Sequence, residues 1–203
     1  NLARSGDPGE RTLGLRNLSR IRLRTGKPVL PRGLAHRLFL RELRSYRSAV
    51  EPSIALENAH YPEIRLLGES WQEYGEAALE RALRALACWY DPKPVSGAFE
   101  RLKSRDYEDV APALEYLVHA LPRPVFRPIR EIFESRLIRE RTRGDERPTR
   151  VVEWIRTAWE TGDPWMRACA VRASFRVTEA NRSWFRDGEP SALVEAELAA
   201  RFP

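Results

Sequence analysis

The apolar residues of this 203-residue chain recur with a helical period, and proline marks where the expected helices begin. The clearest stripe has the spacing i, i+3, i+4, i+7, i+8 and i+11, which favours a helix with one buried face; it consists of Val110, Ala113, Leu114, Leu117, Val118 and Leu121. Asp-Pro pairs at Asp7, Asp91 and Asp163 begin three further helices, because aspartate caps the first backbone N–H groups and proline fits the first turn. No segment alternates apolar and polar residues over several positions, so we expect no β-sheet.

These helix-start and helix-end signals predict about nine helices joined by short links, so that consecutive helices pack antiparallel. The first runs from Pro8 to about Thr25, and the second begins near Pro31 and is kinked or ended by Pro52. A long third helix begins at Pro62. The later helices are expected near residues 92–102, 110–121, 124–135, 151–161, 164–173 and 191–200. Residues 136–148 are almost all charged, so we expect a connecting loop or a frayed helix end there.

A short motif recurs at the helix starts. Residues 163–170 read D-P-W-M-R-A-C-A, residues 7–11 repeat the D-P-x-x-R part, and residues 105–115 hold a weaker copy with Val110 in place of the arginine. The aspartate caps the helix, and the arginine one turn later is positioned to pair with an aspartate of its own or of a neighbouring repeat. We therefore expect structural roles in the repeat for Asp7, Arg11, Asp106, Asp163, Pro164 and Arg167.

The motif resembles the second helix of HEAT repeats, which are the helical hairpins of armadillo-like α-solenoids. Residues 154–177 form the most complete single repeat. From Asp7 to about Val177, the order of elements is similar to the HEAT-like region behind the membrane domain of certain bacterial major-facilitator or nucleotide-translocase-like proteins. The resemblance implies an all-α, HEAT-like α-α superhelix of antiparallel hairpins. It would form one domain over residues 1–203, with an irregular insertion at about 136–148 and a degenerate end after 177.

Composition excludes several other classes. Ala, Leu, Glu, Arg and Lys make up about half of the chain, as is typical of helical proteins. The two cysteines, Cys88 and Cys169, are too few for a disulfide scaffold and lie on apolar stripes, so we expect buried free thiols in a reducing compartment. The longest apolar run, residues 85–90, is far too short to span a membrane. The chain begins at Asn1 without a visible signal peptide, which suggests a piece of a longer cytoplasmic protein.

The net charge of +6 is unevenly distributed along the chain. Residues 1–47 carry 12 basic and 3 acidic side chains, residues 48–122 carry 7 and 13, and residues 123–203 carry 16 and 13. Within the basic segment, arginines recur at helical spacing on the first two expected helices. Such rows form either a binding face for an anionic partner or a solvated surface; the rows are Arg16, Arg20 and Arg24, and Arg37, Arg41 and Arg44.

Candidate catalytic and metal-binding patterns are weak. The E-x-x-H pair Glu57 and His60 occurs once, whereas a di-iron helical bundle needs two such pairs and two further glutamates, so we expect no metal and no cofactor. A further row of glutamates reads as a solvated face or as a partner for arginines of a neighbouring helix; it comprises Glu69, Glu73, Glu76 and Glu80.

Tryptophans beside an aspartate raise one enzymatic alternative. Some HEAT-like solenoids are DNA glycosylases that use aromatic residues and an aspartate on a concave basic face. Here Asp163 lies between Trp159 and Trp165, with Trp154 nearby. However, Trp154 and Trp159 fall on an apolar stripe that predicts core packing, and Asp163 already has a role as a helix cap.

We therefore predict a non-enzymatic scaffold or regulatory module that binds a protein partner and belongs to a larger, membrane-associated cytoplasmic protein. An anionic membrane surface is an alternative partner for the basic start of the chain. The alternative function is a nucleic-acid-binding HEAT-like protein, with DNA glycosylase activity as one form of it. It is less favoured because the acidic middle interrupts the basic track. No small-molecule substrate is expected.

Overall fold

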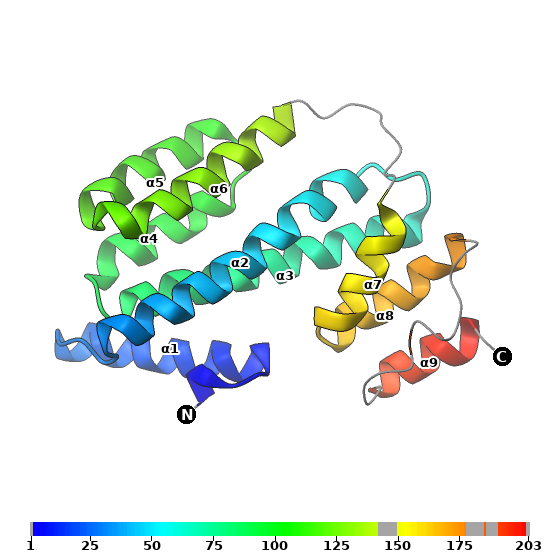
Figure 1. Ribbon diagram of the computed structural model, residues 1–203, viewed down its shortest axis with the longest axis horizontal. Coiled ribbons are helices and arrows are strands. Elements are labelled where there is room, and N and C mark those ends of the chain that lie inside the picture. Colours follow the sequence, from blue (N-terminus) through cyan, green and yellow to red (C-terminus); the bar gives the residue numbers. More distant parts are fainter. Residues whose placement is uncertain (1, 142–149, 178–184, 186–190, 202–203) are drawn as a thin grey trace. The chain divides into compact units, whose positions relative to one another are not determined.

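The computed structural model describes residues 2–141, 150–177, 185 and 191–201, and every regular element in them is a helix. This confirms the all-α prediction, with no strand in the described ranges (Figure 1). The elements are η1 (Leu2–Arg4), α1 (Pro8–Thr25), α2 (Arg32–Leu56), α3 (Pro62–Ala87), α4 (Pro92–Lys103), α5 (Tyr107–Ala120), α6 (Arg123–Arg141), α7 (Val151–Thr161), α8 (Pro164–Ala173), η2 (Ser174–Arg176) and α9 (Ala192–Arg201).

Aspartates cap four of these helices, at the positions the sequence pattern indicates. The Asp7 carboxylate accepts a hydrogen bond from the Glu10 backbone N–H at 2.8 Å, and the Asp163 carboxylate accepts one from Met166 at 2.9 Å. Asp106 and Asp91 cap α5 and α4 in the same way. Each cap satisfies a backbone N–H group that has no partner inside its helix.

Two expected helix ends lie elsewhere in the structure. Pro52, which was expected to kink or end the second helix, does not end α2, which continues to Leu56. Residues 136–141, expected to be a connecting loop or a frayed helix end, are not a loop but the last residues of α6, and residues 142–149 lie outside the described ranges. The reason is Arg136, which is buried and donates hydrogen bonds to the Tyr46 hydroxyl at 2.8 Å and to the backbone carbonyls of Leu102 and Ser104. This arginine therefore holds the end of α6 against α2 and the end of α4.

The chain divides into two compact units. Unit 1 comprises Asn1–Arg47 and Gly75–Thr142, and unit 2 comprises Ser48–Tyr74 and Arg143–Pro203. The division therefore falls within α2 and α3. The expected degenerate end after 177 includes a regular helix, α9, and the single-domain organisation remains a prediction.

Unit 1 contains the hairpin of α4 and α5, with α6 packed against α5 and α1 near α4 (Figure 1). Each of the helices α1 to α6 contributes buried apolar side chains to this unit. The largest fully buried ones are Phe39, Phe133, Leu15, Leu79, Leu86, Leu102, Leu117 and Ile129.

Unit 2 contains a second hairpin, formed by α7 and α8, with α9 packed against α8. Its core surrounds the buried side chains of Leu67, Trp71 and Ile155. At its edge, Arg176 donates two hydrogen bonds to the Glu63 carboxylate, at 2.8 and 3.0 Å, and these bonds lower the pKa of Glu63 to about 2.

Gly68 marks a close approach between α3 and the end of α2 within unit 2. A Cβ atom at this position would lie 2.8 Å from the Leu56 Cβ and 3.2 Å from the Leu56 carbonyl carbon. Backbone is among the atoms that would clash, so rotation of a side chain alone would not relieve the contact. The absence of a side chain at Gly68 therefore lets the two helices pack closely.

We predict that Gly68→Ala lowers the free energy of unfolding by about 1–3 kcal/mol, because overpacking outweighs the gain in helix propensity. The matched control is Gly97→Ala in α4, where no atom lies within 4 Å of the added Cβ. That substitution should stabilise the protein by up to about 1 kcal/mol. Urea unfolding followed by circular dichroism measures both; equal effects of the two substitutions would contradict the close approach.

Candidate functional site

Four of the six arginines expected at an anion-binding surface lie exposed on unit 1. Arg20 and Arg24 are on α1, and Arg37 and Arg44 are on α2. Their side chains make no hydrogen bond or ion pair with any residue in the part of the chain that the structure describes. These four guanidinium groups therefore carry positive charge that the described residues of the same chain do not neutralise.

Arg16, a fifth member of the predicted set, already has an acidic partner. Its Nε and Nη2 atoms donate to the two carboxylate oxygens of Glu80, each at 3.0 Å, and Arg84 donates to the same carboxylate at 2.7 Å. Burial alone would raise the pKa of Glu80, but the hydrogen bonds from Arg16 and Arg84 hold it below its ordinary value. Glu80 therefore acts as the partner of arginines from its own and a neighbouring helix, which was one of the two interpretations of the glutamate row.

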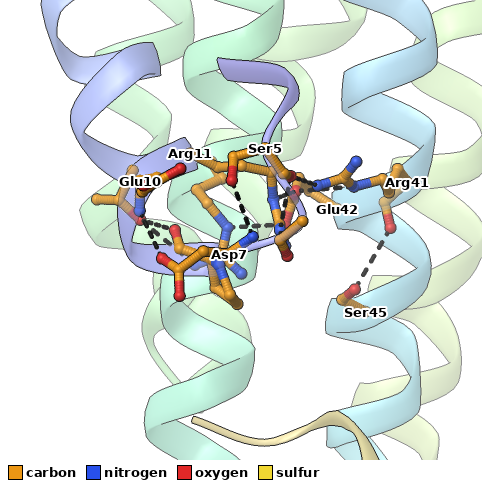
Figure 2. Close-up of polar contacts among 11 residues, drawn as sticks. Ser5, Asp7, Glu10, Arg11, Arg41, Glu42 and Ser45 are labelled. Carbon is orange, nitrogen blue, oxygen red and sulfur yellow. Dashed lines mark hydrogen bonds and ion pairs between the residues drawn. The ribbon is translucent and has the colours of Figure 1, made fainter. Parts of the chain in front are cut away.

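Arg41, the sixth member, is partly buried and already has partners within unit 1. Its Nη2 donates to the Ser5 carbonyl oxygen at 2.8 Å, and its Nε lies 3.5 Å from a Glu42 carboxylate oxygen (Figure 2). Burial and the neighbouring charge of Arg11 lower the pKa of Arg41. The side chain thus fastens the link between η1 and α1 to α2.

Glu42 is the centre of this cluster, and its side chain is fully buried. One carboxylate oxygen accepts from Arg11 Nε and the other from Arg81 Nε, both at 2.7 Å. Arg11 also donates to the carbonyl oxygens of Gly6, at 2.5 Å, and Ser5, at 3.3 Å (Figure 2). Since Arg11, Glu42 and Arg81 come from α1, α2 and α3, one carboxylate joins three helices.

Sequence reasoning did not identify Glu42 or Arg81 as an ionic pair. A usable signal was present for Glu42, which is one of three acidic residues in the first 47. It also lies four residues from both Leu38 and Tyr46, on the buried side of its helix. An acidic side chain on an apolar stripe in a strongly basic segment indicates a buried partner for arginine.

The arginines of the repeated D-P-x-x-R motif do not pair with aspartate as expected. Arg11 pairs with Glu42, and the guanidinium of Arg167 lies over the ring of Trp159, 5.7 Å from its centroid. The motif therefore fixes the helix start in both copies, while the neighbouring helix determines what the arginine contacts.

The residues considered for glycosylase chemistry do not gather into one exposed site. Trp154 and Trp159 are buried in the core of unit 2, as the apolar stripe predicts, and Trp165 is exposed. The carboxylate of Asp163 caps α8.

The cysteines and the acidic residues provide no further site. Cys88 and Cys169 are free and buried, and burial raises the pKa of each thiol to about 12. Within residues 2–141, 150–177, 185 and 191–201, no three His, Cys, Asp or Glu side chains are grouped to hold a metal ion.

Comparisons with family models, curated proteins and solved structures find no match to this chain. None of the described helices is both long enough and apolar enough to cross a membrane. What the chain binds is therefore inferred from the charge and exposure of its own side chains.

We predict that Glu42→Gln lowers the free energy of unfolding by about 3–5 kcal/mol, because it leaves two buried guanidinium groups without a counter-charge. Glu134→Gln is the matched control: Glu134 also accepts from an arginine Nε at 2.7 Å, but both side chains of that pair are exposed. The control should cost less than about 1 kcal/mol. Urea unfolding of the two variants measures the difference, and a Glu42→Gln variant as stable as the control would show that the buried pair is not required.

Proposed function

We propose that the chain is a non-enzymatic, HEAT-like α-solenoid module that binds an acidic protein partner through unit 1 and forms part of a larger cytoplasmic protein. One observation carries the proposal. Arg11 and Arg16 on α1 each pair with a glutamate of the same chain, whereas Arg20 and Arg24 farther along that helix have no such partner among the described residues. An external anion would neutralise the charge that the fold leaves uncompensated.

The helical hairpins support the HEAT-like assignment. The α4–α5 and α7–α8 pairs each consist of two short helices joined by a tight link, and the second helix of each begins at an aspartate cap, Asp106 or Asp163. Hairpins stacked on their neighbours are the building principle of α-solenoids, which present extended surfaces to binding partners.

The side chains around the unpaired arginines favour a protein over a membrane or a nucleic acid. Leu13, Ile21 and Leu23 on α1 are 57, 48 and 53% exposed. At about 100° per residue, Leu23 and Ile21 lie at the two edges of the outward face, with Arg20 between them. A membrane would bury the middle of that face most deeply, where Arg20 and Arg24 lie on one line with Leu13, and a phosphate backbone would gain from the charge but not from the apolar residues. A protein surface that combines acidic and apolar groups fits all of these residues.

The test reverses the four unpaired arginines together, as Arg20→Glu, Arg24→Glu, Arg37→Glu and Arg44→Glu. The probe is a fluorescent helical peptide rich in Glu and Leu, titrated at low salt. Each lost exposed ion pair is worth a few tenths of a kcal/mol, so we expect the dissociation constant to rise at least about tenfold. Arg127→Glu with Arg130→Glu on α6 is the control, which should change it less than about threefold.

Parallel titrations with duplex DNA and with vesicles containing phosphatidylserine distinguish the alternatives. Tighter binding of DNA than of the peptide, with a steep dependence on salt, would replace the proposal with nucleic-acid binding. Preferential retention on the vesicles would replace it with membrane binding. Peptide binding that survives the fourfold reversal would show that these arginines are not the site.

A further inference from the structure

The outward face of α5, in unit 1, carries two glutamates along its middle, together with the exposed Pro112 and His119, and apolar side chains at its edges. Glu108 and Glu115 are exposed and lie seven residues apart, so they fall on one line along the helix. Tyr116, 53% exposed, lies on one side of this line, and Val118, 43% exposed, lies on the other. Neither carboxylate makes an ion pair with a described residue, and α5 contains no lysine or arginine.

The outward face of α1 has the same arrangement with the opposite charge. Arg20 and Arg24 lie in its middle, on one line with the exposed Leu13, and Leu23 and Ile21 lie at its two edges. Arg20 and Arg24 are about 6 Å apart along the helix axis, and Glu108 and Glu115 about 10 Å, at 1.5 Å per residue. Laid along each other, the two faces would set arginine against glutamate and apolar edge against apolar edge.

These two faces cannot meet within one molecule. Figure 1 shows α1 and α5 at opposite edges of unit 1, with α4 and parts of α2 and α3 between them. A second copy of the same chain can, however, present the complementary face to each of them.

We infer that copies of this chain associate head to tail, with the outward face of α1 on one copy against the outward face of α5 on the next. This rests on the proposed function and names the acidic partner of α1 as a second copy. As long as the assembly is open, a contact between two different faces leaves one free face of each kind at its ends. Such a contact closes into a ring or continues as a filament.

The test measures the mass of the full chain by sedimentation velocity over a range of concentrations at low salt. One variant reverses α1, as Arg20→Glu with Arg24→Glu, and another reverses α5, as Glu108→Arg with Glu115→Arg. We expect the wild type to associate, and each variant alone to dissociate at least about tenfold more readily, because like charges then face each other. An equimolar mixture of the two variants should associate again, since each reversed face then meets its complement.

Three controls keep the inference falsifiable. Circular dichroism confirms that each variant is folded, and Arg127→Glu with Arg130→Glu makes the same charge change on α6, where association should persist. Leu23→Ser with Tyr116→Ser should weaken association without any change of charge. A wild type that stays monomeric at every concentration would overturn the inference, and so would association that survives either reversal or a mixture that stays monomeric.

Self-association and binding of an acidic peptide can each fail without the other. Binding of the acidic peptide by a chain that remains monomeric would leave the proposed function standing and remove self-association. Self-association without binding of the peptide would do the reverse, because α1 would then recognise the α5 face rather than acidic helices in general.

Discussion

Unit 1 is organised around a single buried carboxylate. Glu42 has no access to solvent, so its charge is tolerable only with both guanidinium groups of Arg11 and Arg81 in place. Those groups come from α1 and α3, and the carboxylate comes from α2, which makes the position of α1 a consequence of one electrostatic requirement. Arg41 adds a second attachment by holding the Ser5 carbonyl at the start of α1. Which side of α1 faces outward follows from this constraint.

The cluster also explains why an arginine-rich chain uses its arginines in two ways. On α1, Arg11 turns inward to Glu42 and Arg16 is neutralised at the surface by Glu80, whereas Arg20 and Arg24 are exposed and pair with no residue in the part of the chain that the structure describes. Guanidinium suits the buried role because its planar fork satisfies a carboxylate and backbone carbonyls at once, as Arg11 does.

Local signals in the sequence were sufficient to predict the helices and their starts, because an aspartate cap followed by proline depends only on neighbouring residues. They failed where a distant residue decides the outcome. Arg136 was placed in a connecting loop or frayed helix end, yet Tyr46 and the carbonyls at the end of α4 make it a buried helical residue. No local pattern indicated that Arg41 also bonds the Ser5 carbonyl and lies beside Glu42. Helical spacing was enough to name the four exposed arginines, but it could not show that no acidic side chain of the described residues pairs with them.

In the proposed self-association, the charges of unit 1 determine which faces of the two copies can meet. If α1 of one copy met α1 of another, Arg20 and Arg24 of both copies would face each other. If α5 met α5, Glu108 and Glu115 of both copies would face each other in the same way. Only the α1-to-α5 arrangement sets opposite charges against each other while the apolar edges still meet. Like-charge repulsion therefore disfavours symmetric pairs, and the apolar edges add burial to whichever arrangement the charges permit. The attachment of α1 through Glu42 matters for the same reason, because a rotation of that helix would replace the exposed arginines with Leu15 and Ser19 and remove the complementarity.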